Sequence, residues 1–153
     1  MAMRNSASET RPAALAIDAL RAFGCLRLRA DGTSMLPALH PGDVLDFASC
    51  AYPQVEPGEV VLFRRDDRIV IHRVVARTAA GLLTQGDGLA QLDAPVAAAD
   101  LLGRLVGHSR AGRAIAPSRR PRRLPLTRWL FGRSTLAARI FLRWHRATGS
   151  ARA

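Results

Sequence analysis

Residues 58–77, with the sequence GEVVLFRRDDRIVIHRVVAR, determine the fold class of this chain. Two runs rich in Val, Ile, Leu and Phe, at 59–64 and 68–77, lie on either side of a short polar connection. β-Branched and aromatic residues that flank a polar turn are typical of a β-hairpin. We therefore expect two consecutive strands that pair in the antiparallel sense.

Segments on both sides of this hairpin have the same character. Short apolar or alternating runs, separated by Gly, Pro and Asp turns, predict further strands at 25–30, 44–47, 82–85 and 101–108. Because no helical pattern interrupts these strands, the predicted fold class is mainly β, a small antiparallel sheet or barrel. A short amphipathic helix is predicted before the first strand, at 12–23.

The domain organisation follows from the same patterns. The 153 residues suffice for one domain but hardly for two. We assign an N-terminal tail with its short helix, a β domain, a basic proline-containing linker, and a C-terminal basic amphipathic helix with a tail, at 1–24, 25–109, 110–123 and 124–153. The last helix suits a membrane interface or a protein surface equally well, because periodicity does not separate the two.

The charge distribution restricts both chemistry and partners. All 23 Lys and Arg residues are arginine, which excludes a lysine base, a lysine Schiff base and a phosphate-loop lysine. Residues 1–100 hold ten arginines and all twelve acidic residues, whereas 101–153 hold thirteen arginines and no acid. Such a cationic arm attracts anionic lipid and nucleic acid. We expect peripheral membrane contact through residues 124–147, and no specific recognition of nucleic acid.

Other classes of protein are disfavoured by composition. Cys25 and Cys50 are too few for a disulfide scaffold or a cysteine-rich zinc site, although they could pair with each other. No run of the sequence approaches the ~20 apolar residues that a membrane-spanning helix needs. No pattern predicts a metal or an organic cofactor. We expect a protein in the cytoplasm or bound peripherally to the inner face of the membrane.

Two residues are candidates for nucleophilic chemistry. Ser34 lies in a loop between two predicted strands, where Gly32 and Pro37 favour an exposed and rigid hydroxyl. A serine hydroxyl is a weak nucleophile unless a base activates it. His72 lies in the middle of a β-forming run, where a polar ring on an apolar face needs a hydrogen-bond partner. Taken singly, Ser34 could be a turn residue and His72 a structural histidine.

Two aspartates are candidates for orienting His72. If the turn at 78–81 is symmetric, the two residue numbers of each opposed pair in this hairpin add up to ~159. His72 then lies directly opposite Asp87. A bulge at Gly81 would shift that register by one residue. Asp93 is a second possible orienter that reaches in from the following loop. The other histidines, at positions 40, 108 and 145, lack such support, and we interpret them as structural or surface residues.

Four segments, in order, resemble the conserved boxes of signal peptidase I. GTSMLPALHPGD at 32–43 is similar to the nucleophile box, and GEVVLFRRDDRIVIHRVV at 58–75 is similar to the block that follows it. LTQGDGLAQLDAPV at 83–96 resembles the glycine–aspartate box, and LLGRLVG at 101–107 resembles the closing strand. The second block carries a lysine base in bacterial housekeeping enzymes. It reads His-Arg-Val, as here, in archaeal, endoplasmic-reticulum and some sporulation-associated enzymes.

The resemblance, which spans roughly residues 25–108, implies a fold and an activity. The fold would be the mostly β catalytic core of a signal peptidase. The activity would be a serine endopeptidase that cleaves a leader or signal-like peptide, or a precursor protein, after small residues. Ser34 matches the nucleophile and His72 the general base, while Asp87 and Asp93 match the two acidic positions. The resemblance favours Asp93 as the orienting acid, in contrast to the hairpin argument.

The sequence also departs from the family pattern. No segment resembles the usual N-terminal membrane anchor. Gly88 stands where an asparagine-like residue is common, and Gly32 offers no hydroxyl to an oxyanion hole. The alternative hypothesis is therefore a catalytically inactive module of peptidase fold. It would bind peptides or regulate a partner, and its basic tail would bind a membrane or nucleic acid.

Overall fold

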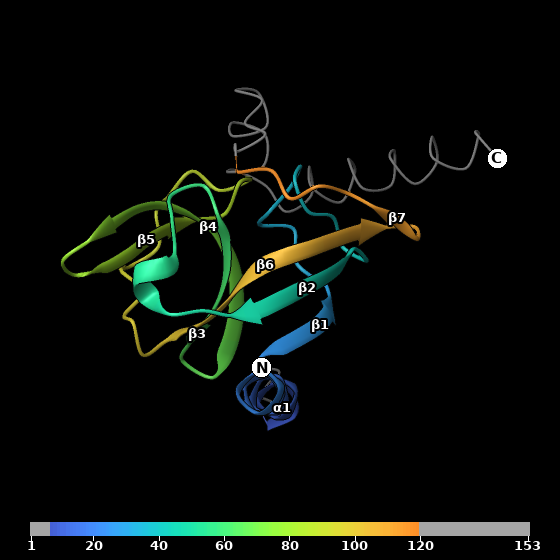
Figure 1. Ribbon diagram of the computed structural model, residues 1–153, viewed down its shortest axis with the longest axis horizontal. Coiled ribbons are helices and arrows are strands. Elements are labelled where there is room, and N and C mark those ends of the chain that lie inside the picture. The colour runs from blue at the N-terminus through green and yellow to red at the C-terminus, as the bar shows by residue number, and fades with distance from the viewer. Residues whose placement is uncertain (1–6, 120–153) are drawn as a thin grey trace, which may run out of the picture.

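The computed structural model describes residues 7–119, and Figure 1 shows how their elements are arranged. One helix, α1 (Ala7–Phe23), precedes an antiparallel sheet of seven strands with the order β1-β2-β6-β3-β4-β5, and β7 pairs with β6. A 3-10 turn, η1 (Tyr52–Gln54), joins β2 to β3. The strands are β1 (Cys25–Arg29), β2 (Val44–Ser49), β3 (Val60–Arg65), β4 (Arg68–Thr78), β5 (Gly81–Gln85), β6 (Leu101–Arg110) and β7 (Arg113–Ala114).

The mainly β class with an N-terminal helix is confirmed, but the sheet does not close into a barrel. Closure would require the two edge strands of the order, β1 and β5, to pair with each other, and each has a single partner strand in the described part of the chain. The helix is also longer than predicted and begins at Ala7. The predicted C-terminal helix lies outside the described residues.

The hairpin of β3 and β4 forms as expected. Its pairing runs from Val60 opposite Arg73 to Arg65 opposite Arg68, so only Asp66 and Asp67 make the turn. Asp66 has a φ of 53°. Aspartate tolerates this left-handed conformation better than most residues, which allows the tight connection.

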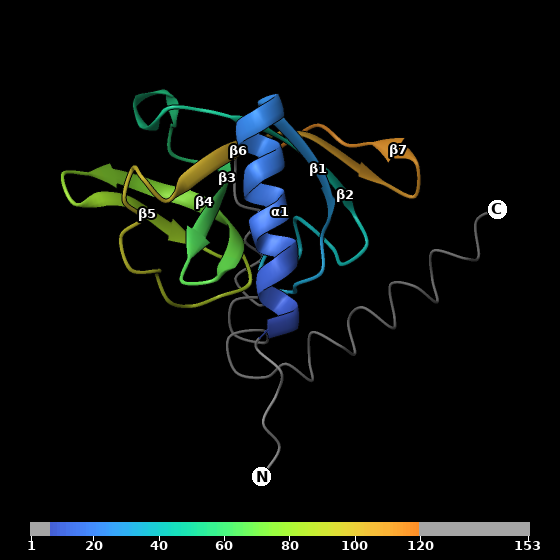
Figure 2. The ribbon, with the colours of Figure 1, turned by 90° about the horizontal axis from the view of Figure 1, so that it is seen from below.

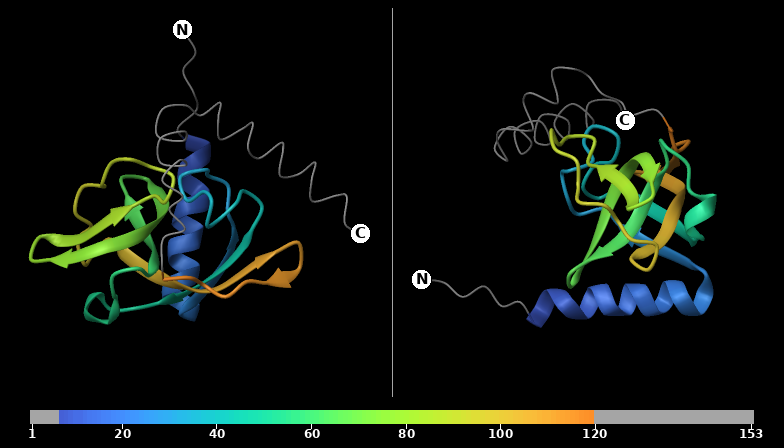
Figure 3. Two further views of the ribbon diagram at one scale, coloured as in Figure 1. Left: turned by 90° about the horizontal axis from the view of Figure 1, so that it is seen from above. Right: turned by 90° about the vertical axis from the view of Figure 1, so that its left-hand side faces the viewer.

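The apolar run of β3 is continuous because the strand is buried on both faces. Successive side chains of a strand point to opposite faces. Accordingly, Val60 and Leu62 join a core cluster with Leu20 of α1, whereas Val61 and Phe63 join a second cluster on the other face. Figure 2 shows α1 crossing the sheet on the side of the first cluster. The connection between β1 and β2 lies at the end of the domain away from α1 (Figures 1 and 3).

The β domain extends beyond its predicted end at residue 109. The first part of the predicted linker turns through Ala111 and Gly112 and forms β7, and the Ile115 N–H then donates to the His108 carbonyl at 2.7 Å. The sequence predicts a basic, proline-containing linker at 110–123, outside the β domain. Arg119 instead forms ion pairs with Glu56 and Glu59 of the domain, at 2.6 and 3.2 Å.

A buried aspartate ties the loop between β1 and β2 to β6. The carboxylate of Asp43 is 1% exposed and accepts hydrogen bonds from the His40 N–H, from His108 Nε2 and from two nitrogens of Arg110, each at 2.8 Å. His40 and His108 are buried, as their structural interpretation implies, although His108 does have an acidic neighbour. Sequence separation hid that contact, because His108 and Asp43 are 65 positions apart in the chain.

This network changes how Asp43 titrates. Burial by itself would raise the pKa of Asp43. The hydrogen bonds from Arg110, the His40 N–H and His108, together with the charge of Arg110, outweigh burial and lower the pKa from 3.8 to about 2. Because the folded-state pKa is depressed, the stabilisation is present above the unfolded-state pKa. It is lost as the pH falls from about 4 through 2.

We predict that Asp43→Asn lowers the free energy of unfolding by about 3 kcal/mol at pH 7, because Arg110 and His108 lose a buried counter-charge. Urea unfolding of both proteins from pH 7 to pH 2 measures the effect. About 2 kcal/mol of the wild-type advantage should disappear towards pH 2.

The matched control is Asp46→Asn, which removes the exposed partner of Arg27 three residues further along the chain, on β2. Exposed ion pairs contribute little, so its unfolding curve should follow the wild type. The role of Asp43 is contradicted if both variants lose the same free energy of unfolding. It is also contradicted if the difference between Asp43→Asn and the wild type is the same at pH 2 as at pH 7.

Candidate active site

Ser34 lies in the connection between β1 and β2, which is closed at its base by two backbone hydrogen bonds. The Ala30 N–H donates to the Asp43 carbonyl at 2.8 Å, and the Gly42 N–H donates to the Ala30 carbonyl at 2.7 Å. Within the loop, the Leu39 N–H donates to Met35 O at 3.0 Å. The Asp43 network therefore anchors the same loop that presents the serine.

A second loop fixes the backbone of Ser34 directly. The Gly88 N–H donates to the Ser34 carbonyl at 2.9 Å. A Cβ at Gly86 would lie 2.6 Å from that same carbonyl oxygen, so only glycine allows the two loops to approach this closely. The glycines on either side of Asp87 thus position the serine rather than contribute side-chain chemistry.

His72 connects the serine to an acidic residue. It lies on β4, is 6% exposed, and places Nε2 3.1 Å from Ser34 Oγ and Nδ1 2.6 Å from Asp93 Oδ2. A carboxylate can only accept, so in a neutral imidazole Nδ1 carries the ring proton and Nε2 accepts from the serine hydroxyl. Three segments distant in sequence therefore meet in one chain of hydrogen bonds.

Asp87, in contrast, does not contact His72. Its two carboxylate oxygens accept from Arg73 Nε and Nη2 at 2.8 and 2.7 Å. The expected register holds next to the turn, where Thr78 lies opposite Gly81. It shifts at a bulge between Val74 and Ala76. The prediction that Asp87 lies opposite His72 is therefore wrong, because the strand pairing is irregular at the bulge and not at the turn.

Alternation along β4 explains why two neighbouring residues have different carboxylate partners. His72 and Arg73 are adjacent, so their side chains leave the strand on opposite faces. Arg73 is 3% exposed and also donates from Nη1 to the carbonyls of Gly58 and Ser118, at 2.7 and 2.6 Å. Sequence analysis missed this role of Arg73, although an arginine inside an apolar run was a signal for a buried ion pair.

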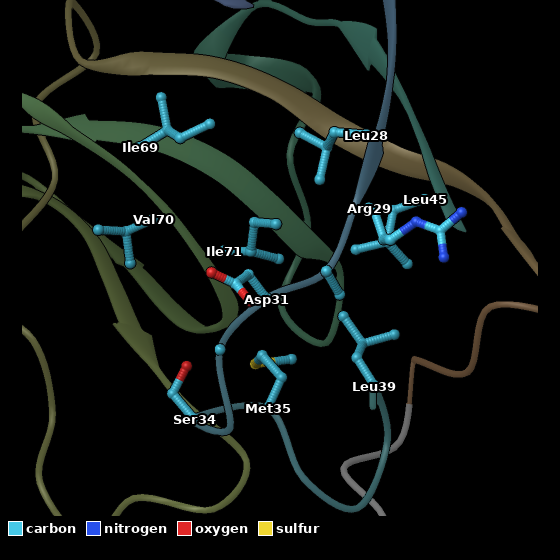
Figure 4. A pocket seen from close by; sticks show the side chains of 12 residues that line it. Leu28, Arg29, Asp31, Ser34, Met35, Leu39, Leu45, Ile69, Val70 and Ile71 are labelled. Atoms are coloured by element: carbon cyan, nitrogen blue, oxygen red, sulfur yellow. The ribbon is translucent and has the colours of Figure 1, made fainter. Parts of the chain in front are cut away.

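An apolar pocket opens beside Ser34. Its volume is about 310 Å³. Its two charged lining residues differ in orientation, because Figure 4 shows the Asp31 side chain directed across the pocket and Arg29 directed away from it. The remaining side chains are mostly aliphatic, and the lining comprises Leu28, Arg29, Ala30, Asp31, Gly32, Ser34, Met35, Leu39, Leu45, Ile69, Val70 and Ile71.

The arrangement is suited to proton transfer from a hydroxyl. The Ser34 proton can pass to His72 Nε2, and Asp93 can hold the ring orientation and stabilise its cationic form. Residues 7–119 contain no group of three or more His, Cys, Asp or Glu side chains placed to hold a metal ion. Cys25 and Cys50 are both free thiols, and burial raises the pKa of Cys50.

No protein-family model matches the sequence, and no curated protein matches it either. In the described part of the chain, α1 is too short and too polar to cross a bilayer, and no other helix there could do so.

The different partners of the two aspartates lead to a prediction about stability. Asp87→Asn should lower the free energy of unfolding by about 3 kcal/mol, because Arg73 would remain buried without a counter-charge. Asp93→Asn should cost about 1 kcal/mol, the typical value of one hydrogen bond, because its carboxylate is more exposed. Urea unfolding at pH 7 compares them, and a larger loss for Asp93→Asn would contradict this assignment.

Proposed function

We propose that the protein is a serine endopeptidase of signal-peptidase type that uses Ser34, His72 and Asp93. The observation that carries the proposal is the continuous hydrogen-bond chain from Ser34 Oγ through His72 to Asp93 Oδ2. This series of hydrogen bonds ends at Ser34, which lines an apolar pocket. Its three residues occupy positions that match the nucleophile, base and acidic boxes of signal peptidase I.

The proposed reaction is acyl transfer to Ser34. His72 Nε2 takes the hydroxyl proton while Oγ bonds to the carbonyl carbon of the scissile peptide. The tetrahedral adduct then breaks its C–N bond, and His72 returns the proton to the leaving amine. Water, deprotonated by the same imidazole, hydrolyses the ester and regenerates the serine. Asp93 holds the Nδ1 proton throughout, so the ring keeps Nε2 directed at Oγ.

Asp87 has a supporting role in this proposal. Its ion pair with Arg73 holds the loop whose glycines contact the Ser34 carbonyl. Of the two acidic positions suggested by the resemblance, Asp93 is thus the orienting acid. Substitution of Asp87 would displace Ser34 and lower the free energy of unfolding.

The pocket bears on the substrate. The side chain preceding the scissile bond would enter a space with aliphatic walls, and the resemblance implies that this side chain is small. The substrate class is then a leader or signal-like peptide, free or on a precursor protein. We further propose that the protein works in the cytoplasm or at the inner membrane face, where residues 124–147, outside the described residues, contact the membrane.

The catalytic assignment predicts that Ser34→Ala and His72→Ala each lower kcat/KM for peptides with small residues before the bond by at least about 10³-fold. Labelling of the wild type by a fluorophosphonate, mapped by mass spectrometry, should fall on Ser34. Asp93→Asn should lower kcat strongly, because an amide no longer holds the reactive tautomer.

Ser49→Ala provides the matched control, since Ser49 is an exposed serine at the end of β2. It should leave cleavage and labelling unchanged. Unfolding midpoints of all variants separate loss of activity from loss of fold. The peptidase proposal is contradicted if the wild type neither cleaves peptides nor reacts with the probe, or if it matches Ser34→Ala in both assays. Either result would favour the inactive peptide-binding module.

Pocket chemistry predicts selectivity for the residue before the bond. Peptides with Ala at that position should be cleaved, whereas Asp should lower kcat/KM at least about tenfold. A buried carboxylate would lose its water among aliphatic walls and would face Asp31. A peptide series that varies this residue measures the effect, with the same substitutions well beyond the bond as the control. Equal cleavage of the Ala and Asp peptides would contradict it.

A further inference from the structure

Asp93 lies in an irregular segment, yet its carboxylate must meet an imidazole fixed on a strand. The segment after β5 is pinned at its far end by the isolated bridge between Leu82 and Val96. Between that bridge and the end of β5, the backbone has no regular strand to hold it. A side chain on such a segment keeps one orientation only if other groups restrain it.

Thr84 supplies one restraint. It lies on β5 with no exposed surface, and its Oγ1 donates to Asp93 Oδ2 at 2.7 Å. That oxygen is the same one that lies 2.6 Å from His72 Nδ1. In the reverse direction, the Asp93 N–H donates to the Thr84 carbonyl at 2.8 Å. One buried residue therefore holds both the backbone and the carboxylate of Asp93.

Arg65 supplies a second restraint at the next residue of the segment. Its Nη2 donates to the Ala94 carbonyl at 2.7 Å. The same guanidinium lies over the ring of Phe63, 5.3 Å from the centroid. Phe63 is fully buried and packs edge-on against His72, with ring centroids 6.2 Å apart and an interplanar angle of 65°. Arg65 thus contacts the carboxylate segment and also the aromatic ring that packs on the base.

We propose that Thr84 and Arg65 are positioning residues that hold Asp93 against His72, an inference that rests on the proposed peptidase function. Neither residue is among those that line the pocket, and the Ser34 hydroxyl lies within hydrogen-bond distance of His72. Their loss should therefore lower kcat and leave KM within about twofold. A positioned carboxylate acts in the transition state, where the imidazole becomes charged, and not in binding of the substrate.

The variants that test the proposal are Thr84→Val, Thr84→Ser and Arg65→Met. Valine keeps the shape of threonine without the hydroxyl, and serine restores the hydroxyl. We expect kcat to fall about tenfold for Thr84→Val, to recover to within threefold for Thr84→Ser, and to fall about threefold for Arg65→Met. Methionine retains apolar contact with Phe63 but cannot donate to Ala94.

The matched control is Arg64→Met. Arg64 is the neighbouring arginine on β3, and its guanidinium pairs with Asp100 at 3.0 Å instead of donating to Ala94. Its kcat should stay at the wild-type value. Arg65→Met alters a partly exposed side chain, so it remains an informative variant even if the buried Thr84→Val does not fold.

A second readout does not require activity. The His72 Nδ1–H, hydrogen-bonded to a carboxylate, should give a downfield proton NMR resonance in the full-length protein. Thr84→Val should shift or broaden it, and Thr84→Ser and Arg64→Met should not. If the wild type cleaves no peptide, the proposed function fails, while this resonance still tests the positioning.

The proposal is overturned if Thr84→Val leaves both kcat and the resonance unchanged, or if Thr84→Ser is as impaired as Thr84→Val. It is also overturned for Arg65 if Arg65→Met and Arg64→Met behave alike. A tenfold rise in KM for Thr84→Val with kcat unchanged would assign Thr84 to substrate binding and likewise exclude the positioning role.

Discussion

The alternation of side chains along β4 is the constraint on which the rest of the site depends. It sends His72 to one face, towards Ser34 and Asp93, and Arg73 to the other, towards Asp87. A one-residue slip of this strand would exchange the two faces, and neither carboxylate would find its partner. The bulge near Val74 belongs to the same arrangement, because it sets which residues of β5 lie beside each part of β4.

The loops are positioned by polar interactions that the sheet makes possible. Ser34 depends on a carboxylate at the base of its loop, Asp43, which is held by Arg110 of β6. It depends equally on the loop after β5, whose glycines contact its carbonyl. Asp87 and Arg73 in turn hold that second loop. The loop that carries Ser34 is thus held by two separate ion pairs of buried aspartates, one to Arg110 of β6 and one to Arg73 of β4.

Arginine has two roles in a chain without lysine. Several arginines are structural, since Arg73, Arg110 and Arg119 each bind carboxylates of the β domain. The planar guanidinium can bind a carboxylate through two parallel hydrogen bonds, as Arg73 and Arg110 do. Part of the positive charge beyond residue 100 is therefore neutralised by acids from the first hundred residues, which a count by segment does not reveal.

Local sequence determined the strands, the turn at Asp66 and the N-terminal helix, because β-branched runs, turn residues and helical spacing act over a few residues. It also singled out Ser34 and His72 through their unusual settings, a rigid loop and an apolar strand. The choice between Asp87 and Asp93 was decided only by tertiary structure, since a bulge that no local pattern marks shifts the register. The open sheet, the addition of β7, and the contacts of Asp43, Thr84 and Arg65 were decided there as well. Each of these depends on which distant backbones lie side by side, and hydrogen bonds between such groups leave no periodic trace in the sequence.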